Sequence, residues 1–421
     1  MHRPLTIVVF GTTGDLYQNK LATALFDLFS SGFLPAKFTI LGFARKPLAD
    51  LEFRKFSEAA IKKRGKKINK TKLVAFLKHL EYIQGDLNSI ESFKNLRLKL
   101  ASNDKKNGAC SNKLFYLAVP PTFYRSIFQS ISKTGLSVPC ATKEGDKKCT
   151  WTRILVEKPF GQDIKEAENL DKMLGKLFDE SQIFRIDHYL AKEAVQNILN
   201  FRFNNGIFEP LWNNKKIEKV RIVFHENNNV SNRGAFYDDL GALRDVGQNH
   251  MLQLLALIAM DNPAQMNKKE IHAARQMILE NTKFRNVLVR GQYEGYLNEK
   301  DVKGDSNTET FFRLNVSINI PRWKGVCFEL ESGKALANGE VFIEVYFKNI
   351  NAHLTFSISS NEGVTYDAYE KVLYDAILGD QTLFVSTKEI MSEWVLITDI
   401  IKKWQKIPLV IYKKGSKGED I

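Results

Sequence analysis

Two stretches of this 421-residue chain carry side chains that can bind anions and move protons. The first, Asp187-His-Tyr-Leu-Ala-Lys192, combines a carboxylate, an imidazole, a phenol and an ammonium group. Because His188 and Lys192 are four residues apart, a helix would place them on one face, beside Tyr189, where they could hold a phosphate. The alternative is a capped helix, with Asp187 as its N-cap and a surface salt bridge from Lys192.

The second stretch contains a histidine that is a candidate general base. His250 follows Asp245 in Arg-Asp-Val-Gly-Gln-Asn-His and precedes the apolar run Met251–Met260. On a helix its neighbours four residues away would be Val246 and Leu254, which is the environment of a core histidine. A partly desolvated histidine with a carboxylate on one ring nitrogen is also how a general base is built, so both interpretations stay open.

A glycine-containing turn is a candidate phosphate-binding loop. The apolar run Thr6–Phe10 leads into Gly11-Thr-Thr-Gly14, followed by a helical pattern, and such a turn lets the backbone approach a pyrophosphate. The next apolar run, Phe38–Gly42, continues to Arg45 rather than to an acidic residue, which suits the 2′-phosphate of NADP. A plain tight turn and an ordinary surface arginine are the alternatives, because the third glycine of the dinucleotide fingerprint is missing.

A lysine at the end of a predicted strand is a further candidate. Lys158 lies in Glu157-Lys-Pro-Phe-Gly161, directly after the apolar run Arg153–Val156. The carboxyl ends of parallel strands are where such sheets bind ligands, so this ammonium group could serve a carbonyl, a hydroxyl or a phosphate. A structural lysine before a proline turn is the alternative.

Two hydrophobic periodicities predict the elements that would position these residues. Continuous apolar runs alternate with helical patterns over about the first 160 residues, which indicates a parallel sheet covered on both faces. After about Arg185, stretches such as Phe312–Ile320 and Val341–Phe347 alternate strictly, which indicates antiparallel strands with one wet face. The fold class is therefore an α/β, doubly wound Rossmann-type domain, residues 1–185, plus an α+β domain with a large, mostly antiparallel sheet, residues 186–421.

Composition limits the partners and the compartment. Hydrophobic residues make up 44% of the chain and charged residues 26%, as in soluble globular proteins, and no run is long enough for a membrane-spanning helix. The net charge is 61 − 48 = +13, which suits an anionic partner, but the densest basic run, Lys62–Lys72, lacks aromatic residues to stack on bases. Four cysteines do not make a disulfide framework, and the first residues lack a signal peptide. We expect a cytoplasmic protein without nucleic-acid or membrane partners.

Taken in order, the motifs resemble those of the glucose-6-phosphate 1-dehydrogenase family from residue 5 to about residue 404. The resemblance rests on the stretches already quoted and on further matches along the chain. These are Gly-Thr-Thr-Gly-Asp-Leu with Lys20, Gly42-Phe-Ala-Arg45, Tyr116-Leu-Ala-Val-Pro-Pro121, Glu157-Lys-Pro-Phe-Gly161, Arg185-Ile-Asp-His-Tyr-Leu, Arg244-Asp-Val-Gly-Gln-Asn-His, Gly333-Lys-Ala-Leu336 and Ala368-Tyr-Glu-Lys-Val-Leu-Tyr-Asp375.

The resemblance implies oxidation of glucose 6-phosphate at C1 with NADP, giving 6-phosphoglucono-1,5-lactone, the first step of the oxidative pentose phosphate pathway. His250 would take the proton of the 1-hydroxyl, Asp187 would orient it, and Lys158 would lie between the sugar and the nicotinamide. The same resemblance implies a homodimer or homotetramer, and no metal.

The resemblance also assigns the binding residues. The 6-phosphate would be bound by His188, Tyr189 and Lys192; the sugar hydroxyls by Glu226, Asp245 and Lys334; and Lys20 would approach the boundary between cofactor and substrate. The cofactor would be lined by Gly11, Thr13, Gly14, Arg45, Pro120 and Lys158.

Several positions depart from the family pattern. Ala191 replaces a glycine, Gly339 lies where a second basic substrate contact is expected, and Ser359 lies where a glutamine is expected. Between Gly363 and Ala368 the chain is shorter by several dozen residues than is usual, so a second, structural NADP site is not expected. These departures leave two alternatives: a dehydrogenase of another sugar or sugar phosphate, and an inactive paralogue.

Overall fold

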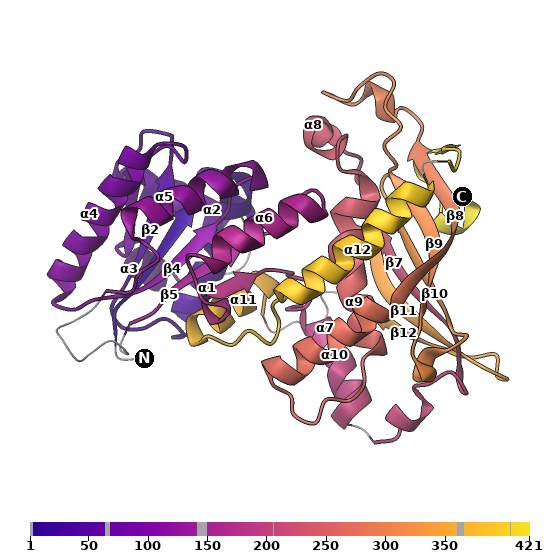
Figure 1. Ribbon diagram of the computed structural model, residues 1–421. Coiled ribbons are helices and arrows are strands. Elements are labelled where there is room, and N and C mark those ends of the chain that lie inside the picture. The colour runs from indigo at the N-terminus through magenta and orange to yellow at the C-terminus, as the bar shows by residue number, and fades with distance from the viewer. Residues whose placement is uncertain (1–2, 64–67, 141–149, 205, 360–365, 405) are drawn as a thin grey trace. The chain divides into compact units, whose positions relative to one another are not determined.

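The computed structural model describes residues 3–63, 68–140, 150–204, 206–359, 366–404 and 406–421 (Figure 1). Backbone contacts divide the chain into two compact units. The first unit comprises Met1–Gly161, Glu168–His188 and Tyr366–Val385, and the second comprises Gln162–Ala167, Tyr189–Thr365 and Ser386–Ile421. The predicted basic run and the shortened stretch fall partly outside the described residues, at 64–67 and 363–365.

The first unit is built on a six-stranded sheet in which all paired strands are parallel. The strand order is β3-β2-β1-β4-β5-β6, with β1 Leu5–Phe10, β2 Phe38–Ala44, β3 Leu80–Gln84, β4 Asn112–Leu117, β5 Thr152–Val156 and β6 Ile183–Arg185. Helices flank the sheet (Figure 1): α1 Ala22–Ser30, α2 Asp50–Lys62, α3 Lys70–Leu77, α4 Ile90–Asn107, α5 Tyr124–Thr134 and α11 Ala368–Leu378, with α6 Ile164–Gly175 crossing the division between the units.

The strand order confirms the predicted doubly wound, Rossmann-type sheet. All six residues of β1 are buried, because a central parallel strand has neighbours on both faces and its apolar run is continuous. The strand order reverses between β1 and β4, because the chain continues from β1 to β2 on one side and from β4 to β5 on the other. Ligands of such sheets bind at this point, outside the carboxyl ends of the strands.

The second unit contains a seven-stranded mixed sheet that is mostly antiparallel, as predicted from the strict alternation. Its order is β12-β11-β7-β10-β9-β8-β13, with β7 Ile217–His225, β8 Thr282–Tyr293, β9 Phe311–Ile318, β10 Cys327–Gly333, β11 Glu340–Phe347, β12 His353–Ser357 and β13 Val410–Tyr412. The parallel pairs are β7 with β10 and β8 with β13. The helices of this unit are α7 Glu193–Leu199, α8 Gly234–Tyr237, α9 Leu252–Ala259, α10 Lys268–Asn281 and α12 Thr387–Trp404.

The two faces of the second sheet differ. Helices α9, α10 and α12 lie along one face (Figure 1), where alternate residues of β7 such as Val220 and Ile222 are buried. On the other face Arg221 pairs with Glu329 at 2.7 Å and with Glu344 at 3.0 Å. This ion-pair network satisfies charged groups that neighbouring side chains partly bury, so the period of two in the sequence separates an apolar face from a charged one.

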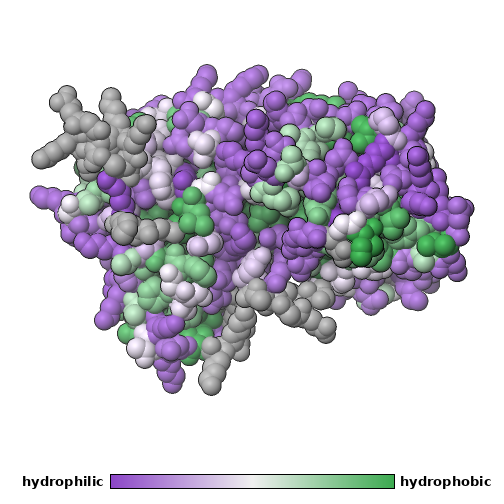
Figure 2. Space-filling view, turned by 90° about the horizontal axis from the view of Figure 1, so that it is seen from below, coloured by the Kyte–Doolittle hydropathy of each residue, from purple (hydrophilic) through white to green (hydrophobic). Residues whose placement is uncertain are grey.

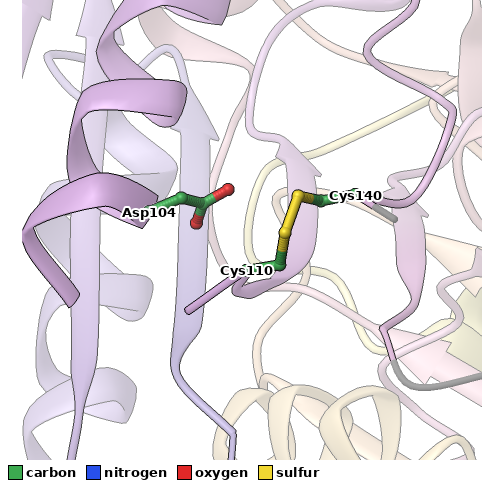
Figure 3. A group of neighbouring side chains, drawn as sticks. All are labelled: Asp104, Cys110 and Cys140. Carbon is green, nitrogen blue, oxygen red and sulfur yellow. A yellow bond between two sulfur atoms is a disulfide. The ribbon is translucent and has the colours of Figure 1, made fainter. Parts of the chain in front are cut away.

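A disulfide joins Cys110, at the turn before β4, to Cys140, beyond α5 (Figure 3). Their Cα atoms are 5.8 Å apart, and the bridge closes a loop with a sequence separation of 30 residues. Asp104 lies beside the bridge and forms an ion pair with Lys113 at 2.9 Å. Cysteine spacing alone did not predict this bridge. Cys327 is free, and Cys149 lies outside the described residues.

The described helices do not include one that is both long enough and apolar enough to cross a membrane. The two longest, α4 and α12, carry lysines in their last turns. On the face drawn in Figure 2 hydrophilic side chains predominate, and hydrophobic side chains form small separate patches.

Candidate active site

The predicted phosphate-binding loop follows β1 and requires glycine. Gly11 has a φ of +84°, and a Cβ atom there would come within 2.4 Å of the carbonyl oxygen of Ala118, after β4. The amide of Gly14 donates to the carbonyl of Gly11 at 2.9 Å, which closes a turn before the helical stretch Tyr17–Leu21. The bare backbone of this loop can therefore approach a ligand closely, as a dinucleotide requires.

The other predicted cofactor residues follow strands that neighbour β1. Arg45 comes directly after β2 and is exposed, and Pro120 follows β4 and is also exposed. Because β1, β2 and β4 are adjacent and parallel, both residues lie at the same edge of the sheet as Gly11. Thr13 lies in the loop itself, and Lys20 is exposed in the first helical turns after it.

Lys158 is the second residue after β5, and it follows Glu157, whose carboxyl group is buried. Glu157 accepts a 2.5 Å hydrogen bond from the hydroxyl of Tyr116, and its backbone carbonyl accepts one from Tyr124 at 2.8 Å. Burial raises the pKa of Glu157 to about 7, and Asp187 adds to this, while Tyr116 and Lys158 oppose it. Glu157 was part of a predicted motif but was given no role, because its burial is not visible in the sequence.

Asp187 and His188 follow β6, and an aromatic ring from a distant helix covers the imidazole. Asp187 is buried, with 3% of its surface exposed, and His188 is half-buried. The ring of Tyr369, on α11, stacks on His188 with centroids 5.4 Å apart. Burial, and then the nearby carboxylates of Glu157, Asp367 and Asp187, raise the pKa of Tyr369 above its usual range. Tyr369 lies in one of the motifs quoted above, but sequence reasoning missed its contact with His188 because the two residues are far apart in the chain.

The prediction that His188 and Lys192 share a helical face is wrong. Residues 188–191 form turns, and α7 begins only at Glu193, with Lys192 as its extended N-cap residue. The amide of Lys192 donates to the carbonyl of Tyr189 at 3.0 Å, and this turn ends before the helix starts. The turn nevertheless brings two of the predicted groups together, because the Nζ atom of Lys192 lies 3.7 Å from the ring centre of Tyr189.

His250 is buried against aromatic rings in the second unit. It lies on the π-helical stretch Leu243–Met251, which continues directly into α9, and 3% of its surface is exposed. The ring of Tyr189 is 4.3 Å from the imidazole, and Phe224, on β7, stacks on it at 6.3 Å. The structure thus places the predicted base beside a predicted phosphate ligand.

The three predicted sugar contacts form one cluster. Glu226 follows β7 and Lys334 follows β10, and because these strands are parallel neighbours both residues lie at the same edge of the sheet. The Nζ atom of Lys334 forms an ion pair with Glu226 and lies 3.5 Å from the carboxylate of Asp245. It also lies 5.1 Å from the ring centre of Tyr237, a neighbour that the sequence did not indicate.

Of the two positions that depart from the expected residues, the structure gives a hydrogen bond to Ser359 and shows room for a Cβ atom at Gly339. A Cβ atom at Gly339 would be 3.4 Å from the side chain of Asn227, an ordinary contact, so there is room for a side chain that this protein lacks. Ser359 uses its hydroxyl to accept a hydrogen bond from the amide of Val341 at 3.2 Å.

The division between the units falls between His188 and Tyr189, so the candidate residues form two sets. The set in the first unit is Gly11, Thr13, Gly14, Lys20, Arg45, Pro120, Lys158, Asp187 and His188. The set in the second unit is Tyr189, Lys192, Glu226, Asp245, His250 and Lys334.

Nearly the whole sequence matches one protein family. Residues 8–197 match "Glucose-6-phosphate dehydrogenase, NAD binding domain", and residues 199–365 and 351–420 match "Glucose-6-phosphate dehydrogenase, C-terminal domain". The chain is 35% identical over 98% of its length to glucose-6-phosphate 1-dehydrogenase of Borreliella burgdorferi, covering 94% of that protein. It is also 35% identical over 98% of its length to the cytoplasmic glucose-6-phosphate 1-dehydrogenase 5 of Arabidopsis thaliana, covering 89% of that protein.

Solved structures give the same result. A glucose-6-phosphate dehydrogenase in complex with its substrate glucose 6-phosphate superposes with a TM-score of 0.88 at 28% identity, over 99% of this chain and 95% of the other. The enzyme from Mycobacterium avium superposes with a TM-score of 0.83 at 28% identity, over 98% of this chain and 95% of the other. A myo-inositol dehydrogenase from Corynebacterium glutamicum, at 11% identity and a TM-score of 0.55, shares the fold alone.

Proposed function

The chain belongs to the glucose-6-phosphate dehydrogenase family and is an NAD(P)-dependent oxidoreductase of glucose 6-phosphate, and we propose that its cofactor is NADP and its base is His250. The observation that carries the cofactor assignment is Arg45, exposed directly after β2, where an enzyme specific for NAD would carry an acidic residue. A guanidinium group pairs well with a 2′-phosphate.

The loop after β1 supports dinucleotide binding. No side chain larger than hydrogen fits at Gly11, so the backbone of Gly11, Thr13 and Gly14 is free to line the pyrophosphate. Pro120 and Lys158 come after β4 and β5, at the same edge of the sheet as the loop, and complete the proposed set of cofactor-binding residues. When bound, oxidised NADP supplies the acceptor for the hydride that leaves the sugar.

In the proposed mechanism His250 takes the proton of the 1-hydroxyl while hydride leaves C1, which gives the 6-phospholactone. A neutral imidazole accepts a proton only on the ring nitrogen that carries none. The carboxylate of Asp187 is proposed to bond the other, protonated nitrogen and so to hold the tautomer that leaves the accepting nitrogen facing the sugar. Lys158 is proposed to orient both reactants, and it is adjacent in sequence to Glu157, whose buried carboxyl group accepts a hydrogen bond from Tyr116.

Substrate binding divides between a phosphate group and a sugar group. His188, Tyr189 and Lys192 are proposed to bind the 6-phosphate, with Lys20 at the boundary between cofactor and substrate. The sugar hydroxyls are assigned to Glu226, Asp245 and Lys334, a choice supported by the 3.5 Å separation of Asp245 and Lys334.

We assign cofactor binding to residues 1–185 and substrate binding and subunit association to residues 186–421. A homodimer or homotetramer is proposed, and light scattering during gel filtration would give the subunit number. Cytoplasmic location is proposed too, and it is supported by relatives with cytoplasmic in their names. Cell fractionation tests it.

The central experiment mixes the protein, NADP and glucose 6-phosphate and follows the absorbance of the reduced cofactor. His250→Asn should lower kcat by ~10²–10⁴ with KM nearly unchanged, because the substitution removes a proton acceptor and leaves the groups that bind the substrate in place. His225→Asn is the matched control, since His225 is another buried histidine of the second unit, bonded to Glu331 on the sheet. Asp187→Asn should be damaging and not additive with the His250 change.

Three outcomes would overturn parts of this proposal. If His250→Asn keeps more than about a tenth of the rate, the base is another group. Faster turnover of another hexose phosphate than of glucose 6-phosphate would favour the alternative substrate class. No turnover of any sugar phosphate, with NADP still bound, would identify an inactive paralogue.

A further inference from the structure

Glu309 is a buried carboxylate that faces the start of the helix carrying Asp245 and His250. Its backbone carbonyl accepts the amide of Ala242 at 3.0 Å, and its Oε1 atom accepts the amide of Leu243 at 3.0 Å. The first amides of a helix have no partner within the helix, so Glu309 caps this one from a distant segment. A negative charge is also favourable at a helix N-terminus.

The turn that leads into this helix is shaped around the carboxylate. Gly241 has a φ of +74°, and a Cβ atom there would come within 2.3 Å of the Oε1 atom of Glu309. Burial raises the pKa of Glu309, while the amide of Leu243 and the charges of Arg244 and Arg290 oppose that change. The carboxylate therefore occupies a place that the backbone has left open for it.

The next residue, Thr310, holds the opposite side of the sugar-binding cluster. Its carbonyl accepts the amide of Lys334 at 2.9 Å, and its hydroxyl accepts the amide of Tyr293 at 2.9 Å. The hydroxyl of Tyr412 lies 2.8 Å from that of Thr310 and donates to the carbonyl of Lys334 at 2.7 Å. The amide of Lys334 is thus tied to Thr310 directly, and its carbonyl is tied to Thr310 through the hydroxyl of Tyr412.

We propose that Glu309 and Thr310 are positioning residues that fix the distance between the helix carrying Asp245 and the turn carrying Lys334. The inference rests on the proposed assignment of Asp245, Lys334 and His250 to the sugar site. Neither positioning residue is required to touch the substrate, because each acts through a backbone amide. A displacement of about 1 Å at a reacting group can cost about 10²-fold in rate, so small movements of this helix matter.

The experiment compares two substitutions of Glu309 with a matched control. Glu309→Met keeps the length of the side chain and removes the acceptor, whereas Glu309→Gln keeps an acceptor for the amide of Leu243. The control is Glu389→Met: Glu389 is also fully buried in the second unit, accepts the amide of Ser386 at 2.8 Å, and pairs with Arg275 at 2.7 Å near the start of α12.

Glu309→Met should lower kcat/KM for glucose 6-phosphate at least about tenfold, with KM for NADP unchanged, and Glu309→Gln should stay within about threefold of the wild type. Glu389→Met should lower the unfolding temperature and leave both KM values unchanged. Hydrogen exchange of peptides covering residues 241–250, followed by mass spectrometry, should be faster in Glu309→Met only.

The proposal is overturned if Glu309→Met and Glu389→Met change kinetics equally, or if exchange at 241–250 is unaffected by Glu309→Met. It is also overturned if Glu309→Gln is as damaging as Glu309→Met. The exchange measurement needs no activity, so an inactive wild-type protein would contradict the proposed function while leaving the capping role of Glu309 measurable.

Discussion

The buried carboxyl group of Glu157 makes the stability of the first unit depend on pH in a direction opposite to that of most carboxylates. Its pKa is raised by burial from 4.5 to about 7, so between these values the folded protein keeps a proton that the unfolded chain has released. The stability contribution is complete below about pH 4.5 and is lost as the pH rises to about 7. Glu157→Gln removes the titration and keeps an acceptor for the hydroxyl of Tyr116.

The magnitude follows from the pKa difference. From 4.5 to about 7 the change is about 2.5 pH units, which at ~1.36 kcal/mol per unit is about 3 kcal/mol. Relative to the wild type, Glu157→Gln should therefore gain about 3 kcal/mol in unfolding free energy between pH 4.5 and pH 8, and most of that gain should appear between pH 5 and pH 7.

Hydrogen exchange of peptides from β4 and β5 in the full-length protein, corrected for the intrinsic pH dependence of exchange, measures this quantity for the first unit alone. Glu91→Gln is the matched control, because it makes the same chemical change at an exposed glutamate of the same unit. If the difference between Glu157→Gln and wild type stays constant within about 0.5 kcal/mol from pH 5 to pH 8, then Glu157 does not hold its proton and the reasoning is refuted.

Three further predictions address the cofactor, the sugar and the disulfide. Arg45→Ala should raise KM for NADP about ten- to a hundred-fold with little change for NAD, because a charge-assisted contact worth roughly 1.5–3 kcal/mol is lost; equal losses for both cofactors would reject this role. Because Gly339 and Ser359 replace groups expected to hold the sugar, the sugar ring should bind about five- to a hundred-fold more weakly than it would with those groups present. Rate measurements should then show some activity on galactose 6-phosphate and almost none on free glucose. Strict rejection of the epimer would show that other residues hold the sugar, and strong activity on free glucose would show that the phosphate ligands are misassigned. Reducing the disulfide between Cys110 and Cys140 should remove about 3–4 kcal/mol through a loop of 30 residues and lower the unfolding midpoint by several degrees, with no such shift on reduction of Cys110→Ser.

Local patterns were sufficient for the class of each sheet and for the order of the motifs. The continuous apolar runs predicted β1 and its neighbours, and the strict alternation predicted β9 and β11, because burial on two faces and burial on one face leave different periods in the sequence. The loop Gly11–Gly14 and Lys158 were placed correctly at strand ends for the same reason. The loop and Lys158 lie at the same edge of the sheet because their strands are parallel, and the alternation of strands and helices in the sequence already implies parallel strands.

Backbone detail at the site was decided by tertiary structure. A pattern of polar residues four apart predicted a helix through Lys192, but the turn closed at Tyr189 delays the helix to Glu193. Leu190 and Ala191 are buried within this turn, and a local pattern of polar residues does not show that packing.

Long-range partners could not be read from the sequence at all. Residues 366–385 belong to the first unit although they follow every strand of the second unit's sheet except β13, and this brings Tyr369 onto His188. Glu309 looks like one surface glutamate among many until the fold sets it against the amide of Leu243. A hydrophobic pattern in the sequence shows which side chains of a helix or strand face the core. Which distant backbone group a buried polar atom satisfies depends on how the elements pack, and only the three-dimensional structure contains that information.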